Sequence, residues 1–421
     1  MKKLISVLLI VVLAFGLFAC GKQEAQEEEK AAWSGSFAAG FSRVDVTPKN
    51  SVGMGGYSET GEPVRMSQGV LNNVYFNCVA LTDEGGNTML LYVLDALKID
   101  YQIAKNIREE VSAATGVPAE NIVINCTHSH STPVVEQASY AKSAIEAATA
   151  ALEDRAAATV TYAAQDVENM SFVRHYTTVS GAVVGSNFGP ANAGAKTGHT
   201  TEADKEMRIL KLEREGKKPI LMVNWMGHAT MVSTGSSDFG KTHRYMISTD
   251  YPGFCQDYVE KNYDCHCVLF MGASGNLVTT SAIAGEGLEK HPVVYGEALG
   301  QHVLDIAEKT QPIQTGAVKS TDTQFEGASA TIVIGALGCG DIGIITAPFE
   351  MFDTTSMGVR EKSPYKATFV LSQANGSYGY MPTDICFDYD DCYECRHTRF
   401  NRGDAEKIID VYAGLLNDIH G

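Results

Sequence analysis

Positive charge is scarce in this sequence. Its 421 residues include 33 lysines and arginines against 50 aspartates and glutamates, which gives a formal net charge of −17. Nucleic acids and anionic lipid surfaces attract basic proteins, so we exclude both as main partners. Internal repeats and linkers are also absent after residue 36. The apolar fraction of 44% is typical of a soluble globular protein, and the sequence predicts one large domain over residues 37–421.

The N-terminal 20 residues have the pattern of a secretory signal. A basic start precedes an apolar run over residues 4–19, which is too short for a comfortable membrane span. Residues 17–20, Leu-Phe-Ala-Cys, resemble a bacterial lipobox, which implies that Cys20 is lipidated and anchors the protein to the cell membrane outside the cytoplasm. An ordinary cleaved signal would also place it outside the cytoplasm. Residues 21–36, rich in Glu, Gln, Lys and Ala, predict a disordered tether.

From residue 37 onward, strand-like and helix-like segments alternate. Turn residues 83–87 join two apolar strands, and Asp100 and Gly116 delimit a helix over residues 101–115. A further helix is expected to begin at Glu350, and residues 404–419 are amphipathic. Residues 180–201 have no periodicity, which indicates a long functional or mobile loop. The pattern predicts an α/β fold with mixed β-sheets flanked by helices.

Two histidines follow a buried strand expected at residues 122–124. Residues two apart on a strand face the same side, so we expect His128 and His130 to point together. Neutral imidazole is the commonest metal ligand, and such a pair can offer nitrogens to zinc. The same pattern also occurs in loops and in hydrogen-bonded cores, so a metal site requires further ligands.

Three other stretches carry side chains that could supply those ligands. His228 lies just after a buried strand, Glu350 follows an apolar strand, and Tyr380 lies in a glycine-rich loop. Each also has an ordinary explanation, as a core histidine, a glutamate favoured by a helix dipole, or a core tyrosine. Residues 272–276, Gly-Ala-Ser-Gly-Asn, form a small-residue loop that suits close backbone approach.

Taken in order, these stretches resemble the catalytic domain of the neutral (non-lysosomal) ceramidases, zinc-dependent amidases that hydrolyse the N-acyl bond of ceramide. The resemblance extends from about Phe41 to Phe400, and we expect no counterpart of the immunoglobulin-like domain that longer ceramidases add. It implies an amphiphilic, lipid-like substrate and a role in sphingolipid metabolism. The motifs that carry it are Gly53 to Tyr57, Gly69 to Leu71, Asp95, Thr127 to Ser131, Asp204 to Met207, Asn224-Trp225 with His228, Ser248 to Gly253, Pro348 to Glu350, and Tyr393-Glu394.

The resemblance implies zinc ligands at His128, His228, Glu350 and Tyr380. Two nitrogens, a carboxylate and a phenolic oxygen suit zinc and leave room for water or a substrate oxygen.

It also implies supporting roles for residues around the metal. His130 is expected to transfer protons or bind substrate, and Arg174 is expected to reach the site, although another alignment places Met170 there. Backbone groups near Gly275 are expected to stabilise an oxyanion together with Arg174. Asn276, which replaces an aspartate of the family's nucleophile loop, is predicted as a third catalytic residue beside His130 and Arg174.

That nucleophile loop is also the main departure from the family, whose pattern is Gly-Asp-x-Ser-Pro. Val278 occupies the serine position here, and the hydroxyls of Ser274 and Thr279 fit only in a shifted register. We therefore expect zinc to activate a water molecule, whose pKa a bound zinc lowers to about 7. Two alternatives remain open: a non-catalytic ligand-binding lipoprotein, and a zinc hydrolase acting on another ester or amide.

Nine cysteines follow Cys20, an odd number, so an exported chain would keep at least one free thiol or form an intermolecular bond. Cys386, Cys392 and Cys395 lie close together with His397 in a short acidic loop. We expect a disulfide there, with a structural metal site as the alternative.

Overall fold

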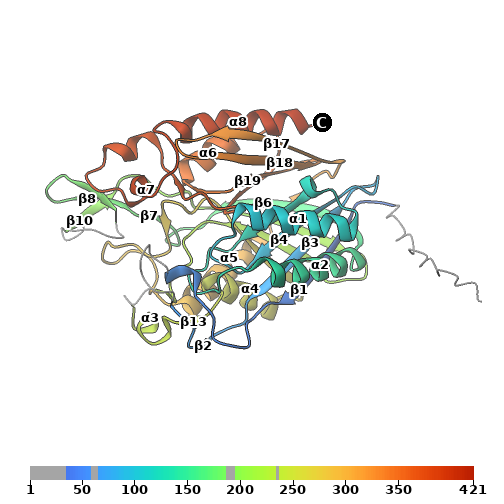
Figure 1. The fold of residues 1–421 in the computed structure, drawn as a ribbon, viewed down its shortest axis with the longest axis horizontal. Helices are drawn as coiled ribbons and strands as arrows, with labels where there is room; N and C mark the ends of the chain where they lie inside the picture. The colour runs from blue at the N-terminus through green and yellow to red at the C-terminus, as the bar shows by residue number, and fades with distance from the viewer. Residues whose placement is uncertain (1–34, 58–64, 186–194, 234–236) are drawn as a thin grey trace, which may run out of the picture. The chain divides into compact units, whose positions relative to one another are not determined.

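Two β-sheets face each other and enclose the central core of the protein (Figure 1). The computed structural model describes residues 35–57, 65–185, 195–233 and 237–421. The predicted signal, Cys20 and all but the end of the predicted tether therefore lie outside the described residues. From Trp33 onward the chain forms a single compact unit.

The larger sheet has nine strands in the order β14-β12-β11-β6-β1-β3-β4-β5, with β16 beside β6. Neighbouring strands are antiparallel except for the parallel pairs β4–β5 and β12–β14. The strands are β1 (Ala38–Asp45), β3 (Tyr75–Thr82), β4 (Thr88–Leu94), β5 (Ile122–Cys126), β6 (Ala156–Asp166), β11 (Glu206–Arg214), β12 (Ile220–Trp225), β14 (His266–Met271) and β16 (Gln311–Pro312).

The second sheet has four strands in the order β17-β18-β19-β21, of which β19 and β21 are parallel. They are β17 (Val318–Glu326), β18 (Thr331–Cys339), β19 (Ile342–Ala347) and β21 (Ala367–Ser372). Short strands pair around the sheets: β2 (Gly69–Val70) with β13 (Met246–Ile247), β7 (Phe172–Val173) with β15 (Leu277–Val278), β8 (His175–Thr178) with β9 (Val183–Gly185) and β10 (Lys196–His199), and β20 (Glu350–Met351) with β22 (Tyr380–Met381).

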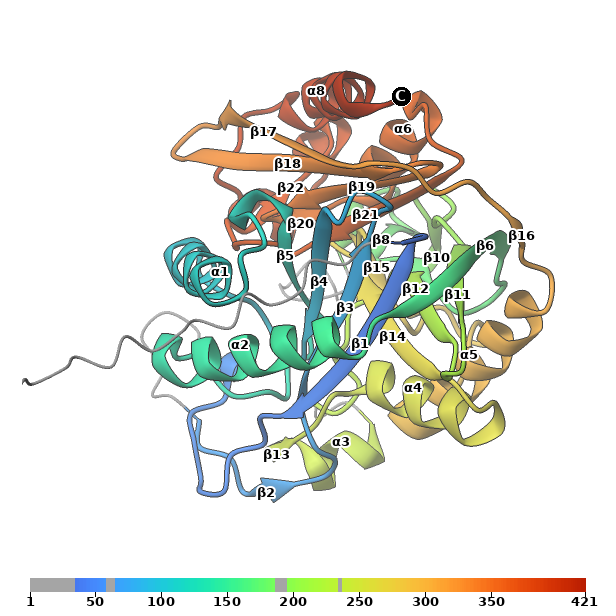
Figure 2. The same cartoon turned by 90° about the vertical axis from the view of Figure 1, so that its right-hand side faces the viewer.

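Helices cover the outer faces of both sheets (Figure 2). On the larger sheet, α1 (Tyr101–Thr115) and α2 (Gln137–Glu153) pack on β3 to β5, while α4 (Tyr251–Asn262) and α5 (Pro292–Ala307) pack on β11, β12 and β14. On the smaller sheet, α6 (Asp353–Lys362) and α8 (Asp404–Ile419) form the outer layer. The short helices are α3 (Asp238–His243) and α7 (Tyr393–Arg396). Within the described ranges, no helix has the length and apolarity needed to cross a bilayer.

The alternation of side chains along each strand explains how the larger sheet contributes residues to two hydrophobic cores, one on each face. In β3, Val79 and Leu81 point toward the second sheet, whereas Cys78 and Ala80 point toward α1 and α2. Successive side chains on a strand face opposite sides, so strands with both faces covered are apolar throughout. This arrangement confirms the predicted α/β fold with mixed sheets flanked by helices.

Local signals in the sequence are also confirmed. The Asp100 side chain accepts a hydrogen bond from the Gln102 amide at 2.8 Å and begins α1, and Gly116 ends it with a φ of 78°. In the hairpin between β3 and β4, Asp83 accepts the Asn87 amide at 2.8 Å.

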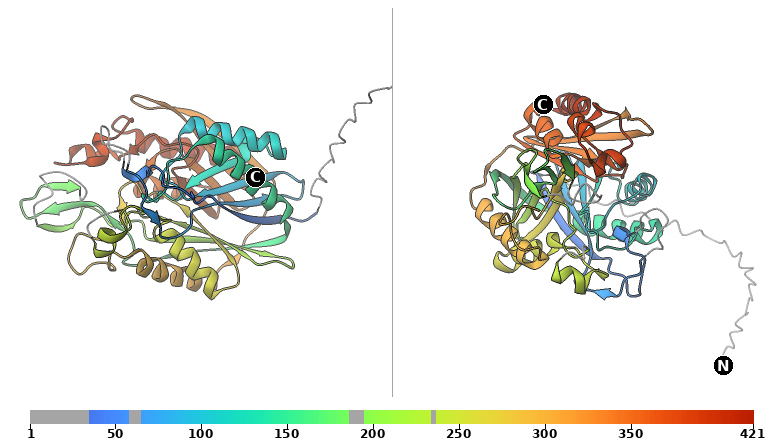
Figure 3. Two further views of the ribbon diagram at one scale, coloured as in Figure 1. Left: turned by 60° about the horizontal axis from the view of Figure 1, so that its bottom comes forward. Right: turned by 90° about the vertical axis from the view of Figure 1, so that its left-hand side faces the viewer.

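Two expectations about local structure are corrected. Glu350 does not begin a helix, because it lies in β20, paired with β22, and the helix α6 begins at Asp353. The stretch 180–201 is not a featureless loop, because β9 and β10 pair with β8 in a three-stranded sheet, although residues 186–194 lie outside the described residues. Figure 3 shows these light-green strands beside the red segment around α7, and the Gly185 amide donates to the Asp391 carbonyl.

Candidate metal centre

Two buried asparagines tie together the strand ends that carry the candidate ligands. The Asn125 side chain, at the end of β5, donates to the Ser372 carbonyl of β21 at 2.6 Å and accepts from the Met271 amide of β14. Asn224, near the end of β12, donates to carbonyls of both β14 and β21. These contacts join the two sheets where β5 and β12 end, so the segments that follow each strand meet at one place.

A turn, rather than strand alternation, directs the histidine pair. His128 has a φ of 58°, beyond the end of β5 at Cys126, so the expectation that His128 and His130 project from one strand is wrong. The His128 amide donates to the Ala96 carbonyl, which stabilises this left-handed conformation. The rings of His128 and His130 nevertheless lie 5.0 Å apart, centre to centre.

Three buried acceptor atoms converge at the end of these strands. His128 Nε2 lies 3.2 Å from His228 Nε2, and Glu350 Oε2 lies 3.3 Å from the first nitrogen and 3.1 Å from the second. These three residues come from three separate segments of the chain, each of which follows a strand. The structure thus brings together three of the four ligands that the resemblance implies.

Hydrogen bonds to the backbone determine where the ring protons are. His128 Nδ1 contacts the Leu97 carbonyl at 2.8 Å, and His228 Nδ1 contacts the Ser274 carbonyl at 2.7 Å. A carbonyl can only accept, so each Nδ1 carries the hydrogen and each Nε2 presents a lone pair. Such contacts orient the imidazoles of metal sites in the same way.

The converging atoms therefore need a cation. Burial, followed by the charge of Arg174, lowers the pKa of His228 to about 4, so the ring is neutral at pH 7. A distance of 3.1 Å to Glu350 would suit an ion pair, but a neutral Nδ1-protonated ring has no proton to offer. Burial alone would raise the pKa of Glu350, but His128 and His228 hold it well below its usual value, so the group is a carboxylate. Three lone-pair donors face one another in a buried space, which is costly unless a positive ion lies between them.

The spacing of the three atoms fits a metal ion. Ligand atoms 2.0–2.1 Å from a tetrahedral zinc lie about 3.3–3.4 Å apart. The observed separations of 3.1, 3.2 and 3.3 Å differ from this value by a few tenths of an ångström. His128, His228 and Glu350 therefore form a candidate metal-binding group, the histidine–glutamate group.

Tyr380 lies beside this group, because β22 pairs with β20 in a register that places it opposite Glu350. Burial, and then the charge of Glu350, raises the pKa of Tyr380 well above its usual value, so the side chain is a neutral phenol here. The Arg174 guanidinium lies over its ring, 5.4 Å from the centre. Its role as a fourth ligand stays a prediction.

His130 is the nearest side chain that could exchange a proton. Its Nε2 is buried and makes no hydrogen bond to any described residue, although part of the ring is accessible. Burial and the neighbouring His128 and His228 hold the pKa of His130 well below its usual value. A neutral imidazole in this position can accept a proton.

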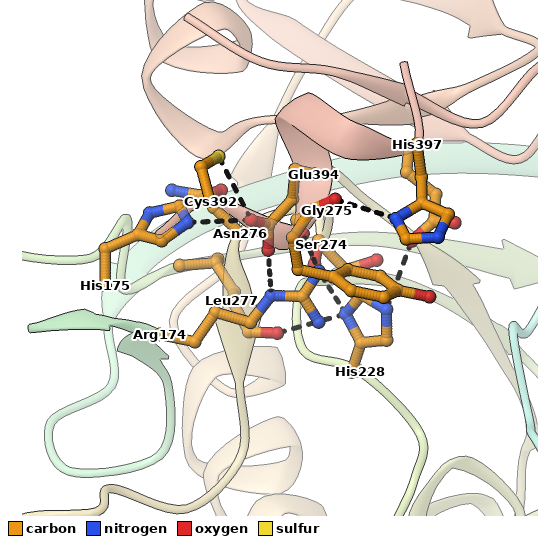
Figure 4. A network of polar contacts seen from close by, with 12 residues as sticks. Arg174, His175, His228, Ser274, Gly275, Asn276, Leu277, Cys392, Glu394 and His397 are labelled. Atoms are coloured by element: carbon orange, nitrogen blue, oxygen red, sulfur yellow. Dashed lines mark hydrogen bonds and ion pairs between the residues drawn. The ribbon is translucent and has the colours of Figure 1, made fainter. Parts of the chain in front are cut away.

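Arg174 reaches the site and is held there by Glu394 (Figure 4). Arg174 Nε lies 2.6 Å from Glu394 Oε1, and the guanidinium also donates to the Gly275 carbonyl at 2.7 Å. Burial alone would raise the pKa of Glu394, but Arg174 and His175 lower it well below its usual value. The alternative alignment is excluded, because Met170 packs in the core beneath α5. Glu394 belongs to the Tyr393-Glu394 motif, but the sequence did not predict that it holds Arg174 in place.

The loop after β14 differs from the sequence expectation in two ways. The Asn276 carboxamide is paired with Asp353, donating to its carboxylate at 2.7 Å and accepting from its amide at 3.0 Å. Its predicted catalytic role stays a prediction. The Gly275 amide donates to the Met351 carbonyl at 2.8 Å, and the oxyanion role of backbone groups near Gly275 also stays a prediction.

Val278, at the expected serine position, forms a backbone bridge with His228 and therefore lies at the site. The nearby Ser274 hydroxyl is buried, and no described residue forms a hydrogen bond with it. The residue at the expected serine position therefore has no hydroxyl, and Ser274, whose carbonyl contacts His228 Nδ1, is a hydroxyl residue of the same loop.

The predicted disulfide is not formed. All nine cysteines of the described chain are free thiols, including Cys386, Cys392 and Cys395. Cys265 and Cys267 are both buried.

Two solved structures share this architecture. The crystal structure of neutral ceramidase from Pseudomonas aeruginosa matches 90% of this chain and 74% of its own, with a TM-score of 0.70 and 13% sequence identity. A structure described as ceramidase complexed with C2 matches with a TM-score of 0.69 and 13% identity, over 90% of this chain and 75% of its own. The chain therefore has the fold of the ceramidase hydrolases.

The sequence comparison identifies the family itself. Residues 37–287 match the family described as neutral/alkaline non-lysosomal ceramidase, N-terminal. This match covers more than half of the chain, so the protein belongs to that family, and the resemblance inferred from the motifs is confirmed. No curated protein sequence matches the chain.

Proposed function

We propose that this protein is a zinc-dependent amidohydrolase that cleaves the N-acyl amide bond of a ceramide-like amphiphilic lipid. The observation that carries the proposal is the convergence of His128 Nε2, His228 Nε2 and Glu350 Oε2 within 3.1–3.3 Å. Membership of the ceramidase family supports a hydrolase with a lipid amide as substrate.

The donor set suits zinc. Two imidazole nitrogens and a carboxylate oxygen are borderline to hard ligands, and three protein ligands plus an open position are typical of catalytic zinc sites. Tyr380, beside Glu350, would provide a weaker fourth contact. A zinc ion bound there would supply the Lewis acidity that polarises an amide carbonyl and activates water.

The surrounding residues would handle protons and charge. His130, neutral and with a buried unpartnered Nε2, would accept a proton from the attacking water and return it to the leaving amine. Arg174 would stabilise negative charge that develops on the carbonyl oxygen, and it would hold the Tyr380 hydroxyl through their hydrogen bond.

Water, rather than a side chain, would be the nucleophile. Val278 lies beside His228, where the family carries its serine, and it has no hydroxyl to offer. Ser274 is the nearest hydroxyl of the loop that could compete for this role, and its removal separates the two mechanisms.

We also propose that the protein acts outside the cytoplasm, anchored through a lipid on Cys20. The lipobox pattern supports this proposal, and an anchor would place the site near amphiphilic substrates. A Cys20→Ala variant is expected to leave the membrane fraction. Its retention there would contradict the anchor without bearing on the catalytic proposal.

The catalytic proposal is tested by metal content and turnover measured together on the full chain. We expect about one zinc bound by the histidine–glutamate group, loss of that zinc in a His128→Ala, His228→Ala double variant, and turnover of a fluorogenic N-acyl substrate that stops on chelation. Binding of the lipid without turnover would favour a ligand-binding lipoprotein. Turnover of other esters or amides alone would retain the metal chemistry and reject the substrate class.

A further inference from the structure

A second group of donor atoms lies on the far side of Glu394 from the Arg174 guanidinium. Glu394 Oε1 contacts Arg174, whereas Oε2 lies 2.9 Å from His175 Nε2 and accepts from the Cys392 thiol at 3.5 Å (Figure 4). One ligand atom from each of His175, Cys392 and Glu394 lies within 4.8 Å of the others, and all three residues are buried.

Two more thiols extend this group. The Cys392 thiol forms a hydrogen bond with that of Cys386, which is also buried, and its sulfur accepts the Cys395 amide at 3.3 Å. The thiolate is the form that binds metals, and a bound cation would displace the thiol protons. Phe352 and Tyr389 pack against these side chains.

From this arrangement we propose that His175, Cys392 and Glu394 bind a second, thiophilic divalent cation such as zinc, with the Cys386 thiol beside Cys392. This thiol site is separate from the histidine–glutamate group and does not depend on the proposed function. Hydrogen bonds carried by the imidazole and the thiols now connect these side chains, and a cation at their centre would replace those protons.

Geometry and charge both fit such a cation. Sulfur and oxygen ligands of a tetrahedral zinc lie about 3.6 Å apart. The observed separation of Cys392 Sγ and Glu394 Oε2 is 3.5 Å. The Cys392 thiolate and the Glu394 carboxylate would carry two negative charges, which a divalent cation would neutralise.

The site also has a route from solvent. A cavity of about 260 Å³ is lined by His175, Cys386 and Tyr389, together with Thr200 and Thr383. A metal ion with its water shell could enter through such a space before it sheds water onto the ligands.

Cobalt substitution of the full-length, reduced protein tests the proposal. Cobalt bound by thiolates gives a sulfur-to-metal charge-transfer band in the near ultraviolet, which the nitrogen and oxygen ligands of the histidine–glutamate group cannot produce. We expect the band in the wild type and in the His128→Ala, His228→Ala variant. We expect its loss in Cys386→Ser, Cys392→Ser, and its retention in the control Cys339→Ser, whose hydroxyl can keep the bond to the Gly316 carbonyl.

Zinc content gives the second measurement. The wild type should hold about two zinc ions per chain, and removal of either ligand group should leave about one. Absence of the cobalt band from the reduced wild type would overturn the proposal, even if the cysteine variants fail to fold. Loss of two titratable thiols from the unreduced protein, with no bound cation, would show a disulfide and overturn it too.

Discussion

The histidine–glutamate group and the thiol site are both buried convergences of potential ligands, but their protons are arranged differently. At the first, backbone carbonyls hold the ring hydrogens on Nδ1 and three bare acceptors face one another. At the second, the imidazole and the thiols make hydrogen bonds within the group, to Glu394 and to each other. A cation is thus required by the first arrangement and accommodated by the second.

The two regions are joined by a buried ion pair and by the apolar packing of Tyr380 with Cys386 and Cys392. Arg174 and Glu394 are both buried, and each of the two regions contacts one of them: Tyr380 lies under Arg174, and His175 contacts Glu394. The comparison therefore predicts that damage to one ligand group leaves the other intact, whereas damage to the ion pair affects both.

The largest effect is expected from His228→Ala. Removal of one of three convergent ligands should abolish metal binding at the histidine–glutamate group and lower kcat/KM by about a thousandfold or more, equivalent to about 4 kcal/mol. Steady-state kinetics and zinc content measure both losses, with the exposed His420→Ala as the control. Full activity in a metal-free His228→Ala protein would refute the role of the group.

Glu394→Gln is expected to break the connection between the regions. The variant leaves the buried Arg174 without its charged partner, which should destabilise the fold by about 3–5 kcal/mol. It should also lower activity by about 10- to 100-fold, because Arg174 loses its orientation over the Tyr380 ring. Denaturant unfolding and kinetics test this, with Glu289→Gln as an exposed control. Unchanged stability would show that the ion pair does not hold the two regions together.

Asp95 offers a contrast with Glu394, as a buried carboxyl that lacks a close cation. Burial raises the pKa of Asp95 to about 7. The folded state therefore holds this proton more tightly than the unfolded state. The stabilisation that results is complete below the unfolded pKa, near 4, and is lost as pH rises toward 7, at up to about 1.4 kcal/mol per pH unit.

Asp95→Asn should remove that dependence. The difference in unfolding free energy between wild type and variant is expected to move in favour of the variant between pH 4 and 7, as measured by urea titrations at several pH values. Parallel stability curves for the two proteins would show that the carboxyl is ionised throughout this range.

The smallest effect is expected from Ser274→Ala. If water is the nucleophile, activity should change by no more than about threefold, about 0.6 kcal/mol, because the Ser274 carbonyl that holds His228 is retained. Steady-state kinetics on the N-acyl substrate provide the test. A loss as large as that of His228→Ala would instead establish a serine mechanism in a shifted register.

Much of the fold follows from local patterns. The boundaries of α1 were predictable because Asp100 and Gly116 act through contacts within a few residues, and α8 was predictable from its amphipathic period. Strand β17 was not anticipated, because its polar, half-exposed residues alternate weakly and its pairing with β18 is what makes it a strand. The helix expected at Glu350 does not form, because the backbone of Glu350 pairs with the neighbouring strand β22 instead.

Motif order was sufficient to identify the family and to name His128, His228 and Glu350, because it records residue types and their sequence. Long-range contacts alone decided the rest. The turn at His128, the proton positions set by the Leu97 and Ser274 carbonyls, and the pairing of Asn276 with Asp353 all depend on atoms from distant segments. Linear spacing carries no information about such contacts, so only the folded chain shows that the three ligand atoms meet.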